Sequence, residues 1–338
     1  MSLSQVANIS IDAIYTSVPK VKMDNLNDDY IGRQQGEKIL DNTGIRYRHI
    51  AIHETAADLC YDAAQKLISE NKIDKDNIEF LVFVSQTPDY VLPASATILQ
   101  DRLGLKSTVA AFDVNLGCSG YVYGLSIISS LLSNSFNKDA QALLLVGDTI
   151  SKLCKPSDSA TYPLFGDAGS ATLLVKSNEG QKMTFDLNSD GSGCEAIKVQ
   201  EGGFKSKDKH GEKTLYLNGM DVFSFGITTV PKAIKSFMLS QEAVVEDFDY
   251  FILHQANKFM NEKIRKKIKA TEEQVPYCLF DYANTSCSTI PLTITSQLIS
   301  ISTKVKLFLC GFGVGLSWAS AIVELTADCK INNSIYNG

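Results

Sequence analysis

The sequence predicts an α/β fold built from two similar halves, and three observations support this prediction. Apolar runs of strand length alternate with amphipathic segments of helix length, which is typical of buried strands connected by helices. Segments far apart in the chain resemble each other in the same order. The 338 residues are enough for two ordinary domains or for one large α/β unit.

Six apolar runs are predicted to be strands, namely residues 77–86, 107–117, 141–148, 170–176, 247–255 and 304–313. The uncharged run Leu307–Val323 contains glycines and is short for a membrane span, so it is predicted to be strand plus turn. The stretch from about Ser177 to Gly211 is richer in Gly, Lys, Asp and Ser and is predicted to be an exposed connection. We therefore expect an N-terminal half at 1–176 and a C-terminal half at 177–338.

Three pairs of segments carry the internal similarity. "EFLVFVSQT" (79–87) resembles "DYFILHQAN" (249–257), and "FGDAGSATLLV" (165–175) resembles "FGVGLSWASAIVEL" (312–325). "FDVNLGCSGYVYGLSIISSLL" (112–132) resembles "FDYANTSCSTIPLTITSQLI" (280–299), and both are predicted to form a strand, a turn of small residues and a helix. Three matches in one order indicate a duplicated α/β unit.

Composition excludes several classes of function. The net charge of -6 argues against general nucleic-acid binding. Eight scattered cysteines without CxxC pairs, beside only four histidines, lack the spacing of a metal site. The start "MSLSQVANIS" does not look like a secretion signal, so we expect a cytoplasmic protein with reduced thiols and no membrane segment.

Cys118 differs from the other cysteines in its position, at the point where a strand pattern turns into a helix pattern. Leu125, Ile128 and Leu132 recur at helical spacing after it, so its thiol is predicted to lie at a helix N-terminus. Backbone N–H groups and the helix dipole would favour the nucleophilic thiolate there. The alternative is a buried structural cysteine, and Cys287 occupies the corresponding place in the second half.

Two further residues are predicted to lie at strand ends or turns. His254 ends an apolar strand, where α/β proteins bind ligands, and it can donate a hydrogen bond or act as a base. Asn284 lies in the turn that corresponds to the Cys118 turn, and its amide can donate to a substrate oxygen. A core histidine and a turn asparagine are the alternatives. The glycine-rich "CGFGVGLSW" (310–318) can offer backbone N–H groups to an oxyanion.

These motifs together resemble one family. "DVNLGCSGYVYGL", "HQAN", "YANTSCSTIP" and "GFGVGLSW" are similar in order and spacing to β-ketoacyl-ACP synthase III, of the thiolase superfamily. "DNTGIRYRHIA", "TPDYVLPASA", "FGDAGSATLL" and "LNGMDVF" extend the resemblance over nearly the whole chain. The resemblance implies a thiolase-like five-layered α-β-α-β-α sandwich of two duplicated halves, a homodimer, and a condensing enzyme without a cofactor.

The resemblance also implies roles. Cys118 would take an acyl group from a thioester of CoA or acyl carrier protein (ACP), and malonyl-ACP would then bind. His254 and Asn284 would stabilise the enolate left by loss of CO2, which would attack the acyl group to give a 3-oxoacyl-ACP. Backbone N–H groups of Cys118, Gly313 and Val314 would form the oxyanion hole. The expected substrate pocket contains Gly219, Phe223, Asn257 and Leu92, and Leu92 would reach the pocket of the partner subunit.

A basic helix is predicted directly after His254. In "HQANKFMNEKIRKKIKA" six cations accompany one acid, while Met260, Ile264 and Ile268 fall on one face and are expected in the core. A solvated helix face is one interpretation. Docking of acidic ACP is the other, and its expected contacts are Lys263, Arg265, Lys266 and Lys267.

Three positions depart from the family pattern. Members that use acyl-CoA often hold its adenine with a tryptophan and arginines, and this chain has Lys38, Asn42 and Ser159 instead. We therefore expect acyl-ACP as donor, or CoA held differently, and a specialised pathway. Three alternatives stay open: acyl transfer to an alcohol or amine, a non-catalytic scaffold, and a thiolase-like role for Cys287 as second cysteine.

Overall fold

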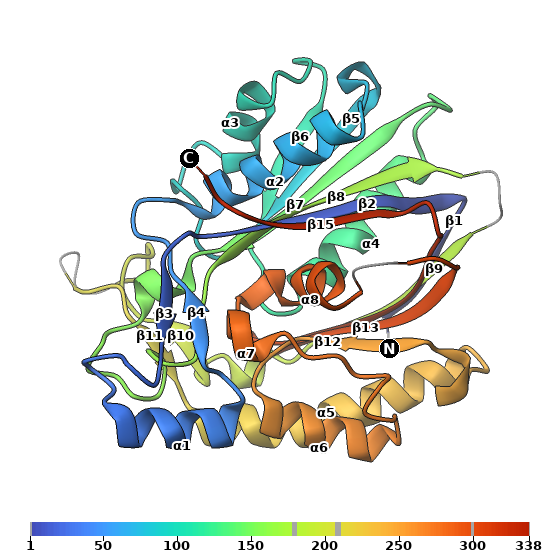
Figure 1. Cartoon of the computed structure of the whole chain (residues 1–338). Helices are drawn as coiled ribbons and strands as arrows, with labels where there is room; N and C mark the ends of the chain where they lie inside the picture. Colours follow the sequence, from blue (N-terminus) through green and yellow to red (C-terminus); the bar gives the residue numbers. More distant parts are fainter. Residues whose placement is uncertain (1, 178–180, 207–210, 299–300, 338) are drawn as a thin grey trace.

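Two β-sheets with helices between them and on both outer faces form five layers in the computed structural model (Figure 1). The structure describes residues 2–177, 181–206, 211–298 and 301–337. The five-layered sandwich expected from the sequence is confirmed.

The first sheet has six strands and contains most strands of the N-terminal half. Strand β5 pairs in parallel with β6 and β7, and β5 and β7 are mostly buried, which explains their uninterrupted apolar runs. The order is β15 (Lys330–Ile335), β2 (Ile9–Val18), β8 (Ala168–Lys176), β7 (Gln141–Asp148), β5 (Ile78–Val84) and β6 (Ala110–Val114).

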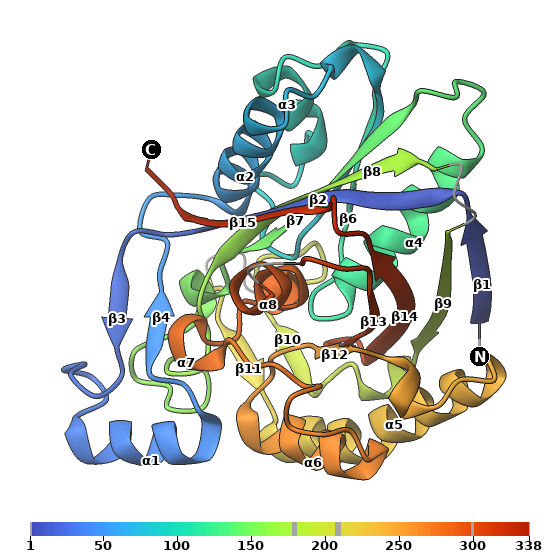
Figure 2. The same cartoon turned by 45° about the vertical axis from the view of Figure 1, so that its right-hand side comes forward.

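The second sheet has five strands and begins with the N-terminal strand of the chain. Its order is β1 (Ser2–Ala7), β9 (Lys182–Ser189), β14 (Ser317–Leu325), β13 (Val305–Gly313) and β12 (Tyr250–Leu253). Strand β1 pairs with β9, while β15 near the C-terminus pairs with β2 of the first sheet. Each sheet therefore takes one strand from the opposite end of the chain, as Figure 2 shows. The division at residue 176 stays a prediction.

Helices α4 (Gly120–Ser133) and α8 (Thr289–Gln297) fill the layer between the sheets (Figure 1). They are apolar or small on almost every side because both sheets cover them, and Leu125 and Ile290 belong to the largest core cluster. A Cβ atom at Gly124 would lie 2.7 Å from Leu144 of β7, so only glycine lets α4 approach the sheet this closely.

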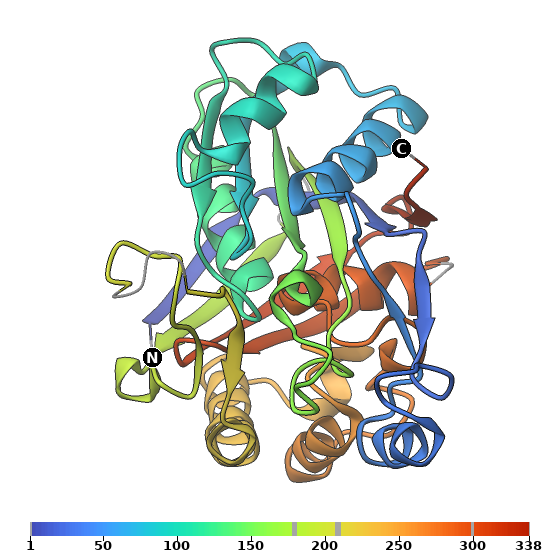
Figure 3. The same cartoon turned by 90° about the vertical axis from the view of Figure 1, so that its left-hand side faces the viewer.

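The outer helices cover the other faces of the sheets, as the third view shows (Figure 3). Helices α2 (Ala56–Glu70) and α3 (Ser95–Arg102) lie on the six-stranded sheet, and α5 (Gly219–Ser240) and α6 (Lys258–Ile268) on the five-stranded one. Helix α1 (Arg33–Thr43) lies beside α6, and α7 (Leu279–Tyr282) precedes α8. Two hairpin-like pairs complete the fold, β3 (Lys22–Asp24) with β4 (Tyr47–His49) and β10 (Ile197–Val199) with β11 (Leu215–Leu217).

The six predicted strands are confirmed, but two other expectations are wrong. Residues 182–189, expected in an exposed connection, form β9 in the interior of the second sheet, with Met183 and Phe185 buried. Their apolar residues alternate with polar ones, which is the pattern of a strand in spite of the polar composition. Leu279–Tyr282, expected as a strand, is the helical turn α7, closed by a hydrogen bond from Ala283 N to Leu279 O (3.0 Å).

No helix among the described residues combines the length and the apolar character that a membrane crossing needs.

A buried ion pair connects β4 to the loop around Tyr162, which leads into the residues that line a cavity. The Arg48 guanidinium donates to Asp28 Oδ2 (2.9 Å), Asn25 Oδ1 (2.6 Å) and the Tyr162 carbonyl (2.9 Å), and it lies 4.4 Å from the Tyr162 ring centre. Arg48 and Asp28 are each 1% exposed at the side chain. Each of the three guanidinium nitrogens therefore has a partner, and removal of the cation would leave the buried Asp28 carboxylate with neutral donors only, namely Tyr162 Oη and Tyr30 N.

We predict that Arg48→Met lowers the free energy of unfolding by about 3–5 kcal/mol, because the Asp28 carboxylate loses its partner in a buried site. Urea unfolding followed by circular dichroism measures the change. Arg33→Met is the matched control, since the Arg33–Glu37 pair is exposed and contributes about 0.5 kcal/mol or less. Equal effects of the two substitutions would contradict a structural role of the Arg48 network.

Candidate active site

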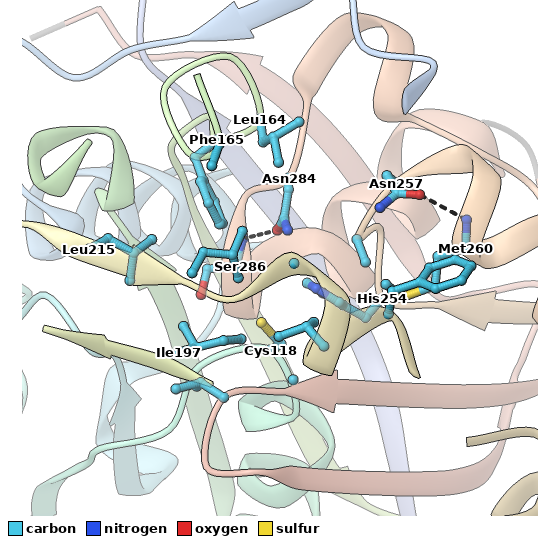
Figure 4. A pocket seen from close by; sticks show the side chains of 18 of the residues that line it. Cys118, Leu164, Phe165, Ile197, Leu215, His254, Asn257, Met260, Asn284 and Ser286 are labelled. Carbon is cyan, nitrogen blue, oxygen red and sulfur yellow. Dashed lines mark hydrogen bonds between the residues drawn. The ribbon is translucent and has the colours of Figure 1, made fainter. Parts of the chain in front are cut away.

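Cys118, His254 and Asn284 line one cavity of about 500 Å³ (Figure 4). They come from three places in the chain, namely the turn before α4, the end of β12 and the turn before α8. The two halves thus both contribute to the site. The structure brings together the three residues for which the sequence predicts chemistry, and their catalytic roles stay predictions.

The turn that carries Cys118 is held by close backbone contact with β13. Gly120 N donates to Gly117 O (2.6 Å) and begins α4. A Cβ atom at Gly311 would lie 2.6 Å from the Cys118 carbonyl oxygen, and one at Gly313 would lie 2.7 Å from its sulfur. Side chains at these two positions would displace the Cys118 turn. The two glycines of "CGFG" leave the room that this turn needs.

The Cys118 thiol is protonated at neutral pH. Burial raises its pKa to about 12, the Asp148 carboxylate adds to this, and the backbone N–H groups of Val314 and Cys118 itself oppose it. The N–H groups at the helix N-terminus do favour the thiolate, as expected, but desolvation outweighs them and the thiol form prevails. The same two N–H groups lie where the oxyanion hole was predicted.

His254 continues β12 by one residue and is almost completely buried. Its N–H donates to Cys310 O (2.8 Å), and its carbonyl accepts from Asn261 Nδ2 (2.9 Å). The Phe312 ring meets the imidazole edge to face at 5.5 Å. Burial lowers the pKa of His254 to about 3, against an opposing effect of the Ser286 backbone, so the ring is neutral. Its Nδ1 lies 2.7 Å from Thr289 Oγ1.

The Asn284 amide is oriented by the backbone around it. Asn284 N donates to Leu164 O (3.0 Å), and Ser286 N donates to Asn284 Oδ1 (2.9 Å). Since the side-chain oxygen accepts from Ser286, the Nδ2 hydrogens are available to a ligand in the cavity. Ala283 and Ser286 both have positive φ (60° and 54°), which L-residues adopt reluctantly and which marks a turn held by its surroundings.

Three of the four predicted pocket residues line the cavity, and the fourth does not. Gly219, Phe223 and Asn257 line it, although Asn257 also caps α6 by accepting from Met260 N (2.8 Å). Leu92 is 77% exposed and lies outside the lining. Its predicted contact with a partner subunit stays a prediction. Gly313 and Val314 of the predicted oxyanion hole are both in the lining.

Much of the apolar lining was missed by sequence reasoning. Ile197 of β10, Leu215 and Leu217 of β11, and Leu164 and Phe165 line the cavity. Strand β10 lies within the segment predicted to be an exposed connection, and β11 follows it. The sequence indicates β11 only through the short alternation "LYL". None of the described lining residues has a charged side chain, which makes the cavity suited to an aliphatic group.

Of the three positions that hold the CoA adenine in relatives, only one lines the cavity of this protein. Ser159 lines it, whereas Lys38 and Asn42 belong to α1 and do not. The described residues also contain no cluster of three or more His, Cys, Asp or Glu suited to a metal ion.

Helix α6 presents its basic residues as predicted, with one exception. Lys263, Lys266 and Lys267 are exposed, while Met260, Ile264 and Ile268 are buried as expected. Lys263 lies 5.1 Å from the centre of the Phe259 ring, and Phe259 lines the cavity.

Arg265 does not belong to the exposed basic face. It is 8% exposed and donates to Glu262 Oε2 (2.7 Å), Glu272 Oε1 (3.1 Å) and the Ala270 carbonyl (3.0 Å). Its guanidinium bonds to the backbone just after the end of α6 and is buried. Arg265 is therefore not available as a docking contact. The helical pattern alone does not show that Arg265 is buried while Lys266 is exposed, because one acidic partner of Arg265, Glu272, lies beyond the end of the helix.

Cys287 is buried outside the cavity lining. Its thiol donates to Asp148 Oδ2 (3.2 Å), and burial together with this carboxylate raises its pKa well above the ordinary value. These contacts do not favour a thiolase-like role as a second catalytic cysteine.

Known proteins resemble this chain over its full length. The 3-oxoacyl-[acyl-carrier-protein] synthase III family matches residues 112–191, and its C-terminal part matches residues 240–325. The β-ketoacyl-[acyl-carrier-protein] synthase III of Streptococcus agalactiae is 32% identical over 330 residues, which cover 96% of this chain and 98% of that protein.

Solved structures agree with this result. A 3-oxoacyl-(acyl-carrier protein) synthase from Burkholderia xenovorans is 34% identical with a TM-score of 0.94, and the match covers 99% of both chains. A 3-oxoacyl-(acyl-carrier-protein) synthase III is 37% identical with a TM-score of 0.88, covering 94% of this chain and all of the other. The resemblance read from the sequence is confirmed: the chain belongs to the β-ketoacyl-[acyl-carrier-protein] synthase III family of condensing enzymes.

Proposed function

We propose that this protein transfers an acyl group to Cys118 and then condenses it with malonyl-ACP, with loss of CO2. The observation that carries the proposal is a neutral Cys–His–Asn set in one cavity whose described lining residues have no charged side chains. Neutral donors suit an enolate, because they stabilise its oxygen and keep no proton acidic enough to quench its carbon. Membership of the condensing-enzyme family supports the same reaction.

In the first half-reaction, the Cys118 sulfur attacks the carbonyl carbon of the donor thioester. The thiol proton passes to His254 and from there to the departing thiol, so the site ends without a change in charge. The developing oxyanion is held by the N–H groups of Cys118 and Val314, the two groups that already act on the sulfur.

In the second half-reaction, the thioester carbonyl of malonyl-ACP accepts hydrogen bonds from His254 and from Asn284 Nδ2. Cleavage of the carboxyl C–C bond releases CO2 and leaves its electron pair in an enolate. The enolate carbon attacks the acyl thioester, a new C–C bond forms, and the C–S bond to Cys118 breaks. The Cys118 thiolate then takes a proton from water, which the high pKa of the buried thiol favours.

The donor is proposed to be acyl-ACP. Among the described residues, the cavity lining offers no cation to the phosphates of CoA, and Lys38, Asn42 and Ser159 lack the stacking groups of an adenine clamp. The exposed Lys263, which lies over the cavity-lining Phe259, and the exposed Lys266 and Lys267 further along α6 suit an acidic carrier protein instead. This departure from the usual priming site supports a specialised pathway.

A homodimer is part of the proposal. Tyr90, Val91 and Leu92 are consecutive, apolar or aromatic, and exposed, with Leu92 at 77%. A second copy that covers this loop would bury them and would bring Leu92 towards the partner's cavity.

We predict that alkylation of Cys118 by iodoacetamide accelerates about tenfold per pH unit from pH 7 to 10. A pKa raised to about 12 leaves the thiolate a minor form that grows tenfold with each unit. Peptide mapping by mass spectrometry measures the rate at Cys118, with free cysteine, whose rate levels off above its pKa of about 8.5, as the reference. A plateau at neutral pH would show a thiolate in the resting site and contradict the raised pKa.

We predict that Asn284→Asp lowers CO2 release from malonyl-ACP about 100-fold or more. The carboxylate keeps the oxygen that accepts from Ser286 N, but it replaces the Nδ2 donor by an oxygen that repels the enolate. Acylation of Cys118 in the same variant should stay within about threefold of the unchanged protein, since that step does not use the amide. Radiolabelled CO2 and intact-protein mass spectrometry measure the two steps.

Cys118→Ala is the control for both measurements and should take no acyl group. If the unchanged protein is acylated but releases no malonyl-dependent CO2, acyl transfer to an alcohol or amine replaces the proposed condensation. If it is not acylated by any donor, a non-catalytic scaffold replaces it.

We predict that acyl-ACP acylates Cys118 with a kcat/KM at least about tenfold above that of the matching acyl-CoA. The double substitution Lys266→Glu with Lys267→Glu should raise the KM for acyl-ACP about tenfold at low salt and leave acyl-CoA unaffected, because like charges then face the carrier. Lys138→Glu, an exposed lysine in the loop after the far end of α4, is the matched control. Efficient use of acetyl-CoA would refute the donor assignment.

A further inference from the structure

The Thr289 hydroxyl is the nearest polar partner of His254 and has no role in the reaction described so far. Thr289 begins α8 and is completely buried. Its Oγ1 lies 2.7 Å from His254 Nδ1 and donates to the Ser286 carbonyl at 3.0 Å. It therefore lies between the catalytic ring and a backbone acceptor.

One hydroxyl proton can serve only one of these two neighbours at a time. When Thr289 donates to the Ser286 carbonyl, its oxygen accepts from His254 Nδ1–H, and Nε2 is an acceptor. When the hydroxyl turns to donate to Nδ1, the proton of the neutral ring is on Nε2, which becomes a donor. Rotation about a single C–O bond thus fits either tautomer of His254.

The two half-reactions require different states of Nε2. Acylation needs a lone pair there to take the Cys118 proton, whereas decarboxylation needs an N–H there to hold the enolate oxygen. In the change between the states, a water molecule gives a proton to Nε2 and the hydroxide that is left takes the proton from Nδ1, so the ring and the water both end neutral. A partner that can both accept and donate at Nδ1 permits this change.

We propose that Thr289 is a positioning residue whose hydroxyl pairs with His254 Nδ1 in both tautomers, so that one ring serves acylation and condensation in turn. This inference rests on the proposed function of the site. Without the hydroxyl, the Ser286 carbonyl, which acts on the His254 ring and lies 3.0 Å from Thr289 Oγ1, would be the nearby polar group on this side, and a carbonyl only accepts. The ring would then be fixed with its proton on Nδ1.

The surroundings hold the hydroxyl in place. The Thr289 carbonyl accepts from Thr293 Oγ1 (2.7 Å) in the first turn of α8, and Phe312 packs on the ring from the other side. His254 is itself 2% exposed, so water has little access to replace the threonine. A valine has the same shape as threonine and lacks only the hydroxyl, while serine keeps the hydroxyl and lacks the methyl group.

The test compares Thr289→Val with Thr289→Ser. The valine variant should lower kcat for malonyl-dependent CO2 release about ten- to a hundredfold with an unchanged KM for malonyl-ACP, because the enolate loses its Nε2 donor. Cys118 acylation should stay within about threefold. The serine variant should keep both rates within about threefold, which is rescue by the hydroxyl alone.

Nitrogen-15 NMR of the imidazole reads the tautomer directly. The His254 signals are assigned by their loss in His254→Gln, among only four histidines in the chain. In the acyl-enzyme with a non-decarboxylating malonyl thioester analogue, the unchanged protein should show Nε2–H, and the valine variant should show Nδ1–H.

Condensation by the valine variant at the unchanged rate would overturn the proposal, as would Nε2–H in that variant. Equal losses in valine and serine variants, or equal losses of acylation and condensation, would reduce Thr289 to a structural residue and overturn it too. Failure of the proposed function is distinguishable, because the unchanged protein would then release no CO2, whereas failure of this inference leaves that activity intact.

Discussion

The site depends on the close approach of two backbones, the Cys118 turn and strand β13. Gly311 and Gly313 leave room for the Cys118 carbonyl and sulfur, where a single methyl group would already collide. This contact joins the two halves beside the cavity that Cys118, His254 and Asn284 line. It also lets the N–H groups of Cys118 and Val314 act on the same sulfur. With a wider separation of the halves, the nucleophile and its oxyanion donors would no longer share one cavity.

Desolvation governs the electrostatics of the site more than any charge does. It raises the pKa of Cys118 and lowers that of His254, and both groups are thereby neutral over the physiological range. The described lining residues have no charged side chains, and this acts on a bound substrate in the same way, because a malonyl carboxylate would find no counter-ion among them. The carboxylate is thus worse solvated in the cavity than in water, and its loss as CO2 relieves that cost. Hydrogen bonds from neutral groups, such as Asn284 Nδ2, are then worth more than they would be in water.

Much of this was predictable from the sequence, and the failures have physical reasons. The parallel strands were recognisable because both of their faces are buried and their apolar runs are continuous. Cys118, His254 and Asn284 stood out because each follows a strand or turn pattern in a duplicated unit. Strand β9 was missed because its composition is as polar as that of a loop. Only the alternation of the apolar Met183 and Phe185 with polar residues marks it as a strand. The protonation of Cys118, the burial of Arg265 and the contact of Thr289 with His254 depend on neighbours distant in the sequence, which no local pattern records.

The exchange of the terminal strands has a consequence for how the chain can fold. Ser2 of β1 pairs opposite Leu187, and Lys330 of β15 pairs opposite Ala13. Neither sheet is therefore complete until residues from the opposite end of the chain have arrived, although the two halves look like separate copies of one unit. During synthesis the edge of β2 that β15 later covers would stay open for more than 300 residues, and an open edge is where foreign strands add. We therefore expect the two halves to fold as one cooperative unit, because each sheet contains a strand from the opposite end of the chain.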